Sequence, residues 1–305
     1  MMTAIRRRLL AAVCLAPALL AADVPVLQTQ SSQWVTISHP GLEASWRIQF
    51  PEAVGTSDVF HLVWHPIPAH WRSEPDGAIA YDWQASGEWV REASEKVNLR
   101  GFALKPGIAL RARMRASSDR IDLSLRLRNL GAAPLRQVWS DGGDLQHQSE
   151  RFIDRDASRT FIHTAGGLLR LSETDRTQRI RALYVFDPLW YQARRVRTWE
   201  YFWGRSDTRP VAAMVAAEAA GGGGAVGIGY EHAIGLMQNS DSHHCMHSAP
   251  FFGDLAPGEA KVRRGVILFG SSAAELFRRF AKLGYRPDFT SPEPAAPPGR
   301  PAERN

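Results

Sequence analysis

Apolar and polar residues alternate with a period of two along much of this chain, whereas helical periodicity is scarce. The clearest example is Ile108–Met114 followed by Ile121–Leu127, where arginines, Ser124 and Asp122 stand between the apolar positions. The Ser117–Arg120 segment that joins the two runs has the composition of a turn. This pattern predicts a β-hairpin with one apolar face and one charged face exposed to solvent.

Further short apolar runs are bounded by Gly, Pro, Asn and Asp, and each predicts a strand. Many short strands at this spacing are typical of a large antiparallel β-sandwich, so we expect an all-β protein. The run at Val211–Ala216 is rich in alanine and could also be helical, but the glycines at 221–224 favour a strand followed by a hairpin connection. The remaining predicted strands are Trp34–Ile37, Leu42–Phe50, Val59–Trp64, Leu135–Trp139, Thr160–His163, Leu168–Leu171, Arg181–Phe186, Ala225–Tyr230 and Val262–Phe269.

One segment near the C-terminus has helical periodicity. Ser271 or Ser272 can cap this short helix, which ends at Gly284. Its apolar stripe consists of Leu276, Phe277, Phe280 and Leu283. Residues 287–305 are rich in Pro, Ala, Arg and Glu with almost no large apolar residue, which predicts a disordered tail. We therefore expect one folded domain over residues 26–286.

Residues 1–22 have the features of a cleaved signal peptide. Arg6, Arg7 and Arg8 precede an apolar stretch from Leu9 to Leu20, which is short for a membrane span. The protein is therefore expected to be periplasmic or secreted, without a stable membrane anchor after cleavage. Removing these residues lowers the formal net charge from +6 to +3. No dense Lys/Arg run with interleaved aromatic residues is present, so no nucleic-acid partner is expected.

Reactive side chains are most concentrated at residues 243–247, where three histidines and Cys245 lie within five positions. If this segment is extended, His243, Cys245 and His247 face the same side and could hold zinc or copper. Otherwise no cofactor is expected. In the alternative interpretation Cys245 is a buried thiol, and His247 either caps the loop, contacts a ligand or transfers a proton.

A carboxylate and an imidazole also adjoin at Glu231 and His232, where a predicted apolar strand ends. Together with His247 they are candidate catalytic residues, because a Glu and a His that meet across strands can act as base and acid. The alternative is a pair of strand-end residues that face water.

Tryptophan is frequent, with 10 residues, and several tryptophans stand beside polar side chains. Sugars present CH faces that pack on indole rings and hydroxyl groups that form hydrogen bonds with polar neighbours. The candidate ligand-binding residues are Trp71, Arg72, Trp190 and Trp203. The alternative is that the tryptophans are ordinary core residues of a sandwich.

The order of these elements resembles that of the galactose-mutarotase-like superfamily over roughly residues 40–283. The segments that carry the resemblance are Ile121–Leu130, Arg159–Ile162, Gly227–His232 and Cys245–Glu259. The resemblance implies a β-supersandwich that binds carbohydrate on its concave sheet. The Asn-His-aromatic-Phe-Asn motif that carries the acid histidine of aldose epimerases is not found in the sequence.

The sequence leaves three classes of function open. The first is an exported carbohydrate-binding protein whose catalytic activity is uncertain. The second is an epimerase or lyase that acts on a sugar or uronate, or a metal-binding module that uses the His243–His247 cluster. The third is a structural or interaction module in which that cluster has no chemical role. Fold alone does not choose among them.

Overall fold

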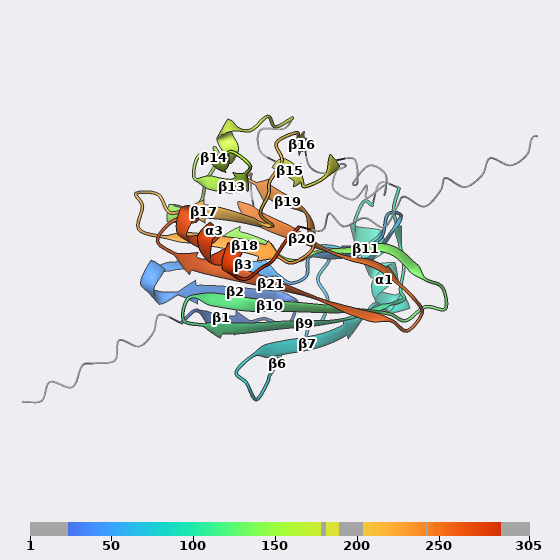
Figure 1. Ribbon diagram of the computed structural model, residues 1–305. Helices are drawn as coiled ribbons and strands as arrows, with labels where there is room; N and C mark the ends of the chain where they lie inside the picture. The colour runs from blue at the N-terminus through green and yellow to red at the C-terminus, as the bar shows by residue number, and fades with distance from the viewer. Residues whose placement is uncertain (1–23, 100, 178–180, 189–203, 242, 288–305) are drawn as a thin grey trace, which may run out of the picture.

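The computed structural model describes residues 24–99, 101–177, 181–188, 204–241 and 243–287 (Figure 1). The predicted signal peptide, residues 1–22, and residues 288–305 of the predicted tail lie outside this part of the chain. Among the described residues, no helix is long and apolar enough to cross a membrane.

The larger of two mostly antiparallel sheets has 12 strands within the described residues. Nine of them follow one path: β1 (Val26–Thr29), β2 (Trp34–His39), β3 (Ala44–Gln49), β12 (Asp144–His147), β20 (Cys245–Leu255), β11 (Leu135–Asp141), β4 (Ala53–Gly55), β5 (Val59–Leu62) and β8 (Ala103–Leu104). A branch leaves this path at β20, which also pairs with β19 (Ala233–Asn239). β19 pairs with β15 (Arg181–Val185), and β15 pairs in parallel with β16 (Gly204–Ser206).

The second sheet has nine described strands, in the order β14 (Gly167–Arg170), β13 (Thr160–Thr164), β17 (Met214–Glu218), β18 (Ala225–Tyr230), β21 (Ala260–Gly270), β10 (Arg120–Asn129), β9 (Ile108–Ser117), β7 (Ile79–Gln84) and β6 (Arg72–Ser73). The predicted hairpin is β9 and β10, with Ile121 opposite Ala116. Its apolar side is buried, while Arg111 and Arg113 on the other side form ion pairs with Glu74. The two sheets face each other and enclose the core, which confirms the predicted all-β sandwich.

The predicted C-terminal helix is present as α3 (Ala273–Lys282), and Ser272 caps it by accepting a hydrogen bond from the Glu275 amide. A second helix, α1 (Gly87–Lys96), forms in a segment where the sequence predicted neither a helix nor a strand. The side chain of Ser86 accepts a hydrogen bond from the Trp89 amide and starts this helix. Only Trp89 and Ala93 of α1 are buried, so its apolar stripe is too short to stand out in the sequence. Three 3₁₀ turns, Pro40–Leu42, Glu150–Phe152 and Leu171–Glu173, complete the described helical segments.

Two neighbouring strands of the larger sheet, β19 and β20, lack the alternation that reveals a strand in a sequence. All seven residues of β19 and the first eight of β20 are buried, so neither face requires polar residues. This burial places the segment that starts at Cys245 in the middle of the sheet rather than in a surface loop.

A buried histidine beside the core gives the fold a predictable dependence on pH. The Trp46 indole N–H donates to Nδ1 of His147 over 3.0 Å, which fixes that nitrogen as an acceptor. Burial, with the nearby His244 and Arg159 charges, lowers the pKa of His147 to about 3. In the unfolded chain this histidine binds a proton near pH 6.5, whereas in the folded chain it stays neutral until the pH approaches 3. The free energy of unfolding therefore decreases as the pH falls below 6.5.

Between pH 7 and pH 5 this histidine should remove about 2 kcal/mol from the free energy of unfolding. His147→Asn keeps an oxygen that can accept the indole hydrogen bond but has no proton to bind. Urea unfolding at both pH values should give a flatter pH dependence for the variant than for the wild type. Equal slopes would show that His147 is not the group responsible.

Candidate functional site

A pocket of about 390 Å³ opens in the larger sheet, over its central strands. Residues far apart in the sequence line it, because β11, β12 and β20 are adjacent in the sheet and β3, β4 and β19 flank them. The lining consists of tryptophans and phenylalanine, three carboxylates, two histidines, Cys245 and several amide or cationic side chains: Trp34, Gln49, Glu52, Ala53, Phe60, Trp64, Trp139, Asp141, Asp144, Gln146, Arg181, Asn239, His243, Cys245 and His247.

Two of the carboxylates are brought together by a glycine pair that links β11 to β12. In a regular strand, residues three apart such as Asp141 and Asp144 would point to opposite faces. Gly142 and Gly143 break that alternation, Gly143 with a φ of +152°. A Cβ at Gly142 would lie 2.6 Å from the Tyr230 ring, so only glycine fits there. The Tyr230 hydroxyl donates to the Gly142 carbonyl over 2.6 Å and holds this link in place.

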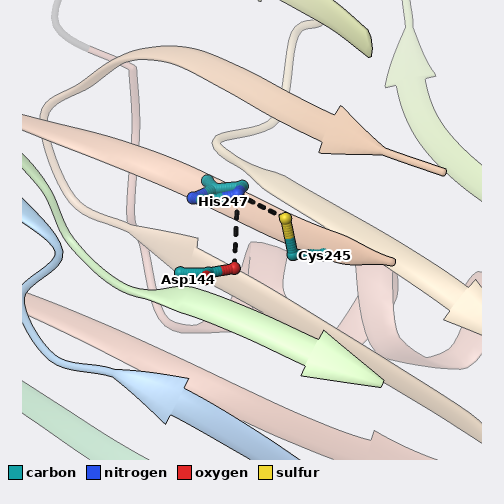
Figure 2. A group of neighbouring side chains, drawn as sticks. All are labelled: Asp144, Cys245 and His247. Carbon is teal, nitrogen blue, oxygen red and sulfur yellow. Dashed lines mark hydrogen bonds and ion pairs between the residues drawn. The ribbon is translucent and has the colours of Figure 1, made fainter. Parts of the chain in front are cut away.

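His247 on β20 is the centre of the polar cluster (Figure 2). Its Nδ1 lies 3.0 Å from Oδ2 of Asp141 and 3.4 Å from Oε2 of Glu52. Its Nε2 lies 2.9 Å from Sγ of Cys245 and 3.6 Å from Oδ1 of Asp144. Cys245 and His247 are two residues apart on one strand, so they point to the same side of the sheet. The imidazole is therefore fixed between carboxylates on one edge and a thiol with a carboxylate on the other.

Burial and mutual repulsion shift the pKa values of this cluster. Burial, reinforced by the charges of Asp144 and Asp141, raises the pKa of Glu52 well above its usual range. Burial likewise raises the pKa of Asp144 and, strongly, that of the Cys245 thiol. Although burial opposes it, the charge and hydrogen bond of Asp141 and the charge of Asp144 raise the pKa of His247. The thiol is therefore neutral at neutral pH, and His247 holds its proton more firmly than a free imidazole does.

The rest of the lining offers flat apolar surfaces and hydrogen-bonding groups. The Trp34 and Trp64 rings are half-buried, and the Arg47 guanidinium stacks over Trp34 at 4.3 Å from the ring centre. Gln146 donates to Oδ2 of Asp144 over 2.6 Å. Arg181 places a cationic side chain at the same pocket. Aromatic faces beside carboxylates and amides suit a ligand that is itself both apolar and rich in hydroxyl groups.

The structure brings together two of the three residues predicted as metal ligands. Cys245 and His247 are buried neighbours in the pocket. His243 also lines the pocket but is exposed, and it belongs to neither group of three residues whose donor atoms lie within 4.8 Å of one another. The reason is that β20 begins only at Cys245, so the strand alternation that we expected to align His243 does not extend to it.

The other predicted catalytic pair lies outside this pocket. The Glu231 carboxylate forms an ion pair with Arg264 at 2.8 Å, and His232 is exposed with a φ of +54° in the turn that follows β18. Neither residue lines the pocket around His247. The structure therefore does not join them to His247.

Of the predicted sugar-contacting residues, the two that the structure describes, Trp71 and Arg72, do not line the pocket. The Trp71 indole donates to the Ser32 carbonyl over 2.9 Å and packs against Tyr81. Arg72 forms an ion pair with Asp82 on the exposed face of the second sheet. Trp190 and Trp203 lie outside the described residues.

Sequence reasoning missed Glu52, Asp141 and Asp144, which supply the carboxylates of the site. One signal was present: two aspartates flank a Gly-Gly pair directly after the predicted strand Leu135–Trp139, and such a pair marks a break in strand alternation. Glu52 has no such signal, because only the pairing of β4 with β11 brings the start of β4 beside Asp141.

No protein-family model matches the chain. No curated protein matches it either.

Solved structures to which the chain is similar include several galactose-mutarotase-like proteins, the superfamily suggested by the sequence. A galactose mutarotase-like protein from Lactobacillus casei gives a TM-score of 0.47 at 8% identity, covering 81% of this chain and 100% of that one. A galactose mutarotase related enzyme from Lactobacillus acidophilus gives 0.45 at 8% identity, covering 81% and 98%. A putative aldose 1-epimerase from Escherichia coli gives 0.42 at 9% identity, covering 81% and 99%.

Proposed function

We propose that this protein is exported and binds a saccharide in the pocket around His247. The observation that carries the proposal is that indole rings and buried hydrogen-bonding groups line one pocket of about 390 Å³. A pyranose ring can pack a CH face on Trp34 or Trp64 while its hydroxyl groups donate to Asp141 or Asp144. Arg181 and Asn239 supply further donors for ring or hydroxyl oxygens.

A pair of tryptophan variants tests this proposal. Both Trp64 and Trp71 are half-buried, but only Trp64 lines the pocket. Trp64→Ala should weaken saccharide binding by about 10-fold or more, the loss of one ring contact of 1–2 kcal/mol. Trp71→Ala should lower the melting temperature without changing the affinity. The measurement is a thermal-shift screen against mono- and oligosaccharides, followed by calorimetric titration of any saccharide that raises the melting temperature.

Two results would contradict the proposal. One is a wild-type protein whose melting temperature no saccharide raises, and the other is a binding saccharide whose affinity Trp71→Ala reduces more than Trp64→Ala. Export is tested separately by sequencing the N-terminus of protein recovered from the periplasm or medium. A mature chain that begins near Asp23 is the expected result.

A second candidate, a sugar epimerase or lyase, is favoured by the arrangement of Glu52, Asp141 and His247. Burial raises the pKa of Glu52, which favours the protonated carboxyl group that can donate a proton, and this carboxyl group lies beside the imidazole of His247. Proton transfer to and from a bound sugar requires a proton donor and a proton acceptor in one pocket, and here Glu52 would be the donor and Asp141 the acceptor. Under this candidate, Glu52→Gln would abolish turnover of a saccharide that the variant still binds.

A further inference from the structure

Nε2 of the His247 imidazole and atoms of two neighbouring side chains form a set of three different metal-binding atoms. Nε2 of His247, Sγ of Cys245 and Oδ1 of Asp144 all lie within 4.8 Å of one another (Figure 2). Sγ is 2.9 Å and Oδ1 is 3.6 Å from Nε2. Atoms bound to one zinc ion in a tetrahedral site lie about 3 to 4 Å apart, so this spacing needs only small side-chain movements to close around a metal.

A buried carboxylate oxygen without a hydrogen bond is a second sign of a cation site. Asp144 is 4% exposed, and its Oδ2 accepts a hydrogen bond from Gln146. Its Oδ1 has no hydrogen bond and is held only by the 3.6 Å ion pair with Nε2 of His247. Burying a carboxylate oxygen without a hydrogen bond is costly, and a cation bound at Oδ1 would compensate that cost.

The other edge of the imidazole is arranged as metal-binding histidines usually are. The Asp141 carboxylate lies 3.0 Å from Nδ1 of His247 and accepts the hydrogen bond of the proton on that nitrogen. The other ring nitrogen, Nε2, is therefore the one that a metal would bind, in place of the proton that Nε2 carries when the imidazole is cationic. A carboxylate behind the imidazole orients the ring and increases its basicity toward a metal. Glu52 and Asp141 form a second group of possible ligands with His247 through Nδ1, but this group has no sulfur ligand, and Nδ1 is already bonded to Asp141.

We propose that Asp144, Cys245 and His247 form a zinc site that opens into the pocket. The ligand set of nitrogen, sulfur and oxygen suits zinc, which binds imidazole, thiolate and carboxylate together. Three protein ligands leave one tetrahedral position for water or a ligand hydroxyl, as in zinc sites that act on substrates. Binding converts the Cys245 thiol to a thiolate and displaces the Nε2 proton of His247, so protons are released to the solvent as zinc enters. The site does not depend on the proposed saccharide, and it is tested in the absence of saccharide.

The experiment uses reduced, chelator-stripped full-length protein titrated with Zn²⁺, with stoichiometry by native mass spectrometry and affinity by competition with a chromophoric chelator. Co²⁺ is the optical probe, because bound thiolate gives a charge-transfer band in the near ultraviolet. The wild type should bind one equivalent of zinc, release protons and show the cobalt band. Cys245→Ser should lose the band and bind zinc at least 100-fold more weakly.

Three further variants separate this ligand set from its alternatives. His243→Ala should bind zinc as the wild type does, because His243 lies outside the group. Glu52→Gln should also leave the affinity unchanged, whereas Asp141→Asn should weaken it about 10- to 100-fold by removing the carboxylate behind the imidazole. Loss of zinc in Glu52→Gln with an unchanged Cys245→Ser would overturn the proposal in favour of the carboxylate group at Nδ1. A wild type that shows neither bound zinc nor a cobalt band would overturn it outright, whatever the variants' folding.

Discussion

His247→Ala is expected to lower the free energy of unfolding by about 3–5 kcal/mol at pH 7 in metal-free buffer. The side chain is 1% exposed and lies within 3.6 Å of the carboxylates of Asp141 and Asp144. Removing the imidazole leaves buried negative charges without a counter-charge, and that is among the costliest changes in a protein interior.

The loss should be smaller at pH 5.5 than at pH 7. Burial already raises the pKa values of Glu52 and Asp144 in the folded protein, and removing a cationic neighbour raises them further. The folded variant then binds protons at these two carboxyl groups that the unfolded chain does not, so their contribution to stability increases as the pH falls toward the raised pKa values, while the contribution of His147 is the same in the variant and the wild type.

Urea denaturation at both pH values measures the effect, with chelator present to exclude a metal contribution. His243→Ala is the matched control, because this exposed histidine lines the same pocket but should change stability by less than about 0.5 kcal/mol. If His247→Ala were as stable as the wild type at pH 7, Asp141 and Asp144 could not be held as buried charges.

The second large effect is expected from Trp46→Ala, which should cost about 3–5 kcal/mol. Trp46 on β3 is fully buried and crosses the space between the sheets. Its ring centre lies 5.3 Å from that of Phe269 on the second sheet and 5.0 Å from that of Phe152. The variant therefore leaves a cavity at the interface of the two sheets and also removes the donor to His147.

Trp46→Phe separates these two contributions. It keeps much of the aromatic volume but lacks the indole N–H, so it should cost less than Trp46→Ala. The free energies of unfolding from urea titrations give the comparison, and Trp71→Ala serves as a control for a half-buried tryptophan at the edge of the core. Equal losses for Trp46→Ala and Trp46→Phe would mean that the hydrogen bond to His147, rather than packing, dominates.

Only part of the site could be predicted from the sequence. Cys245 and His247 could be found because they are chemically distinctive and lie two residues apart. Glu231, His232, Trp71 and Arg72 were chosen by the same criterion of reactive or aromatic type, yet they lie at a strand end, at the edge of the core or on an exposed face. Residue type indicates what a side chain can do, whereas its neighbours in space depend on strand pairing across more than 100 residues.

The sequence by itself determined the strands and helices that have one face buried and the other exposed to solvent. Alternation defined β9 and β10, and the apolar stripe with its serine cap defined α3, because half of each element is solvated and must be polar. Where both faces are buried, as in β19 and most of β20, that constraint disappears. Only the tertiary structure decided that the glycine pair turns Asp141 and Asp144 toward His247, and that Glu52 joins them. The reason is physical: buried charges are stabilised by partners that the fold, not the local sequence, places within contact.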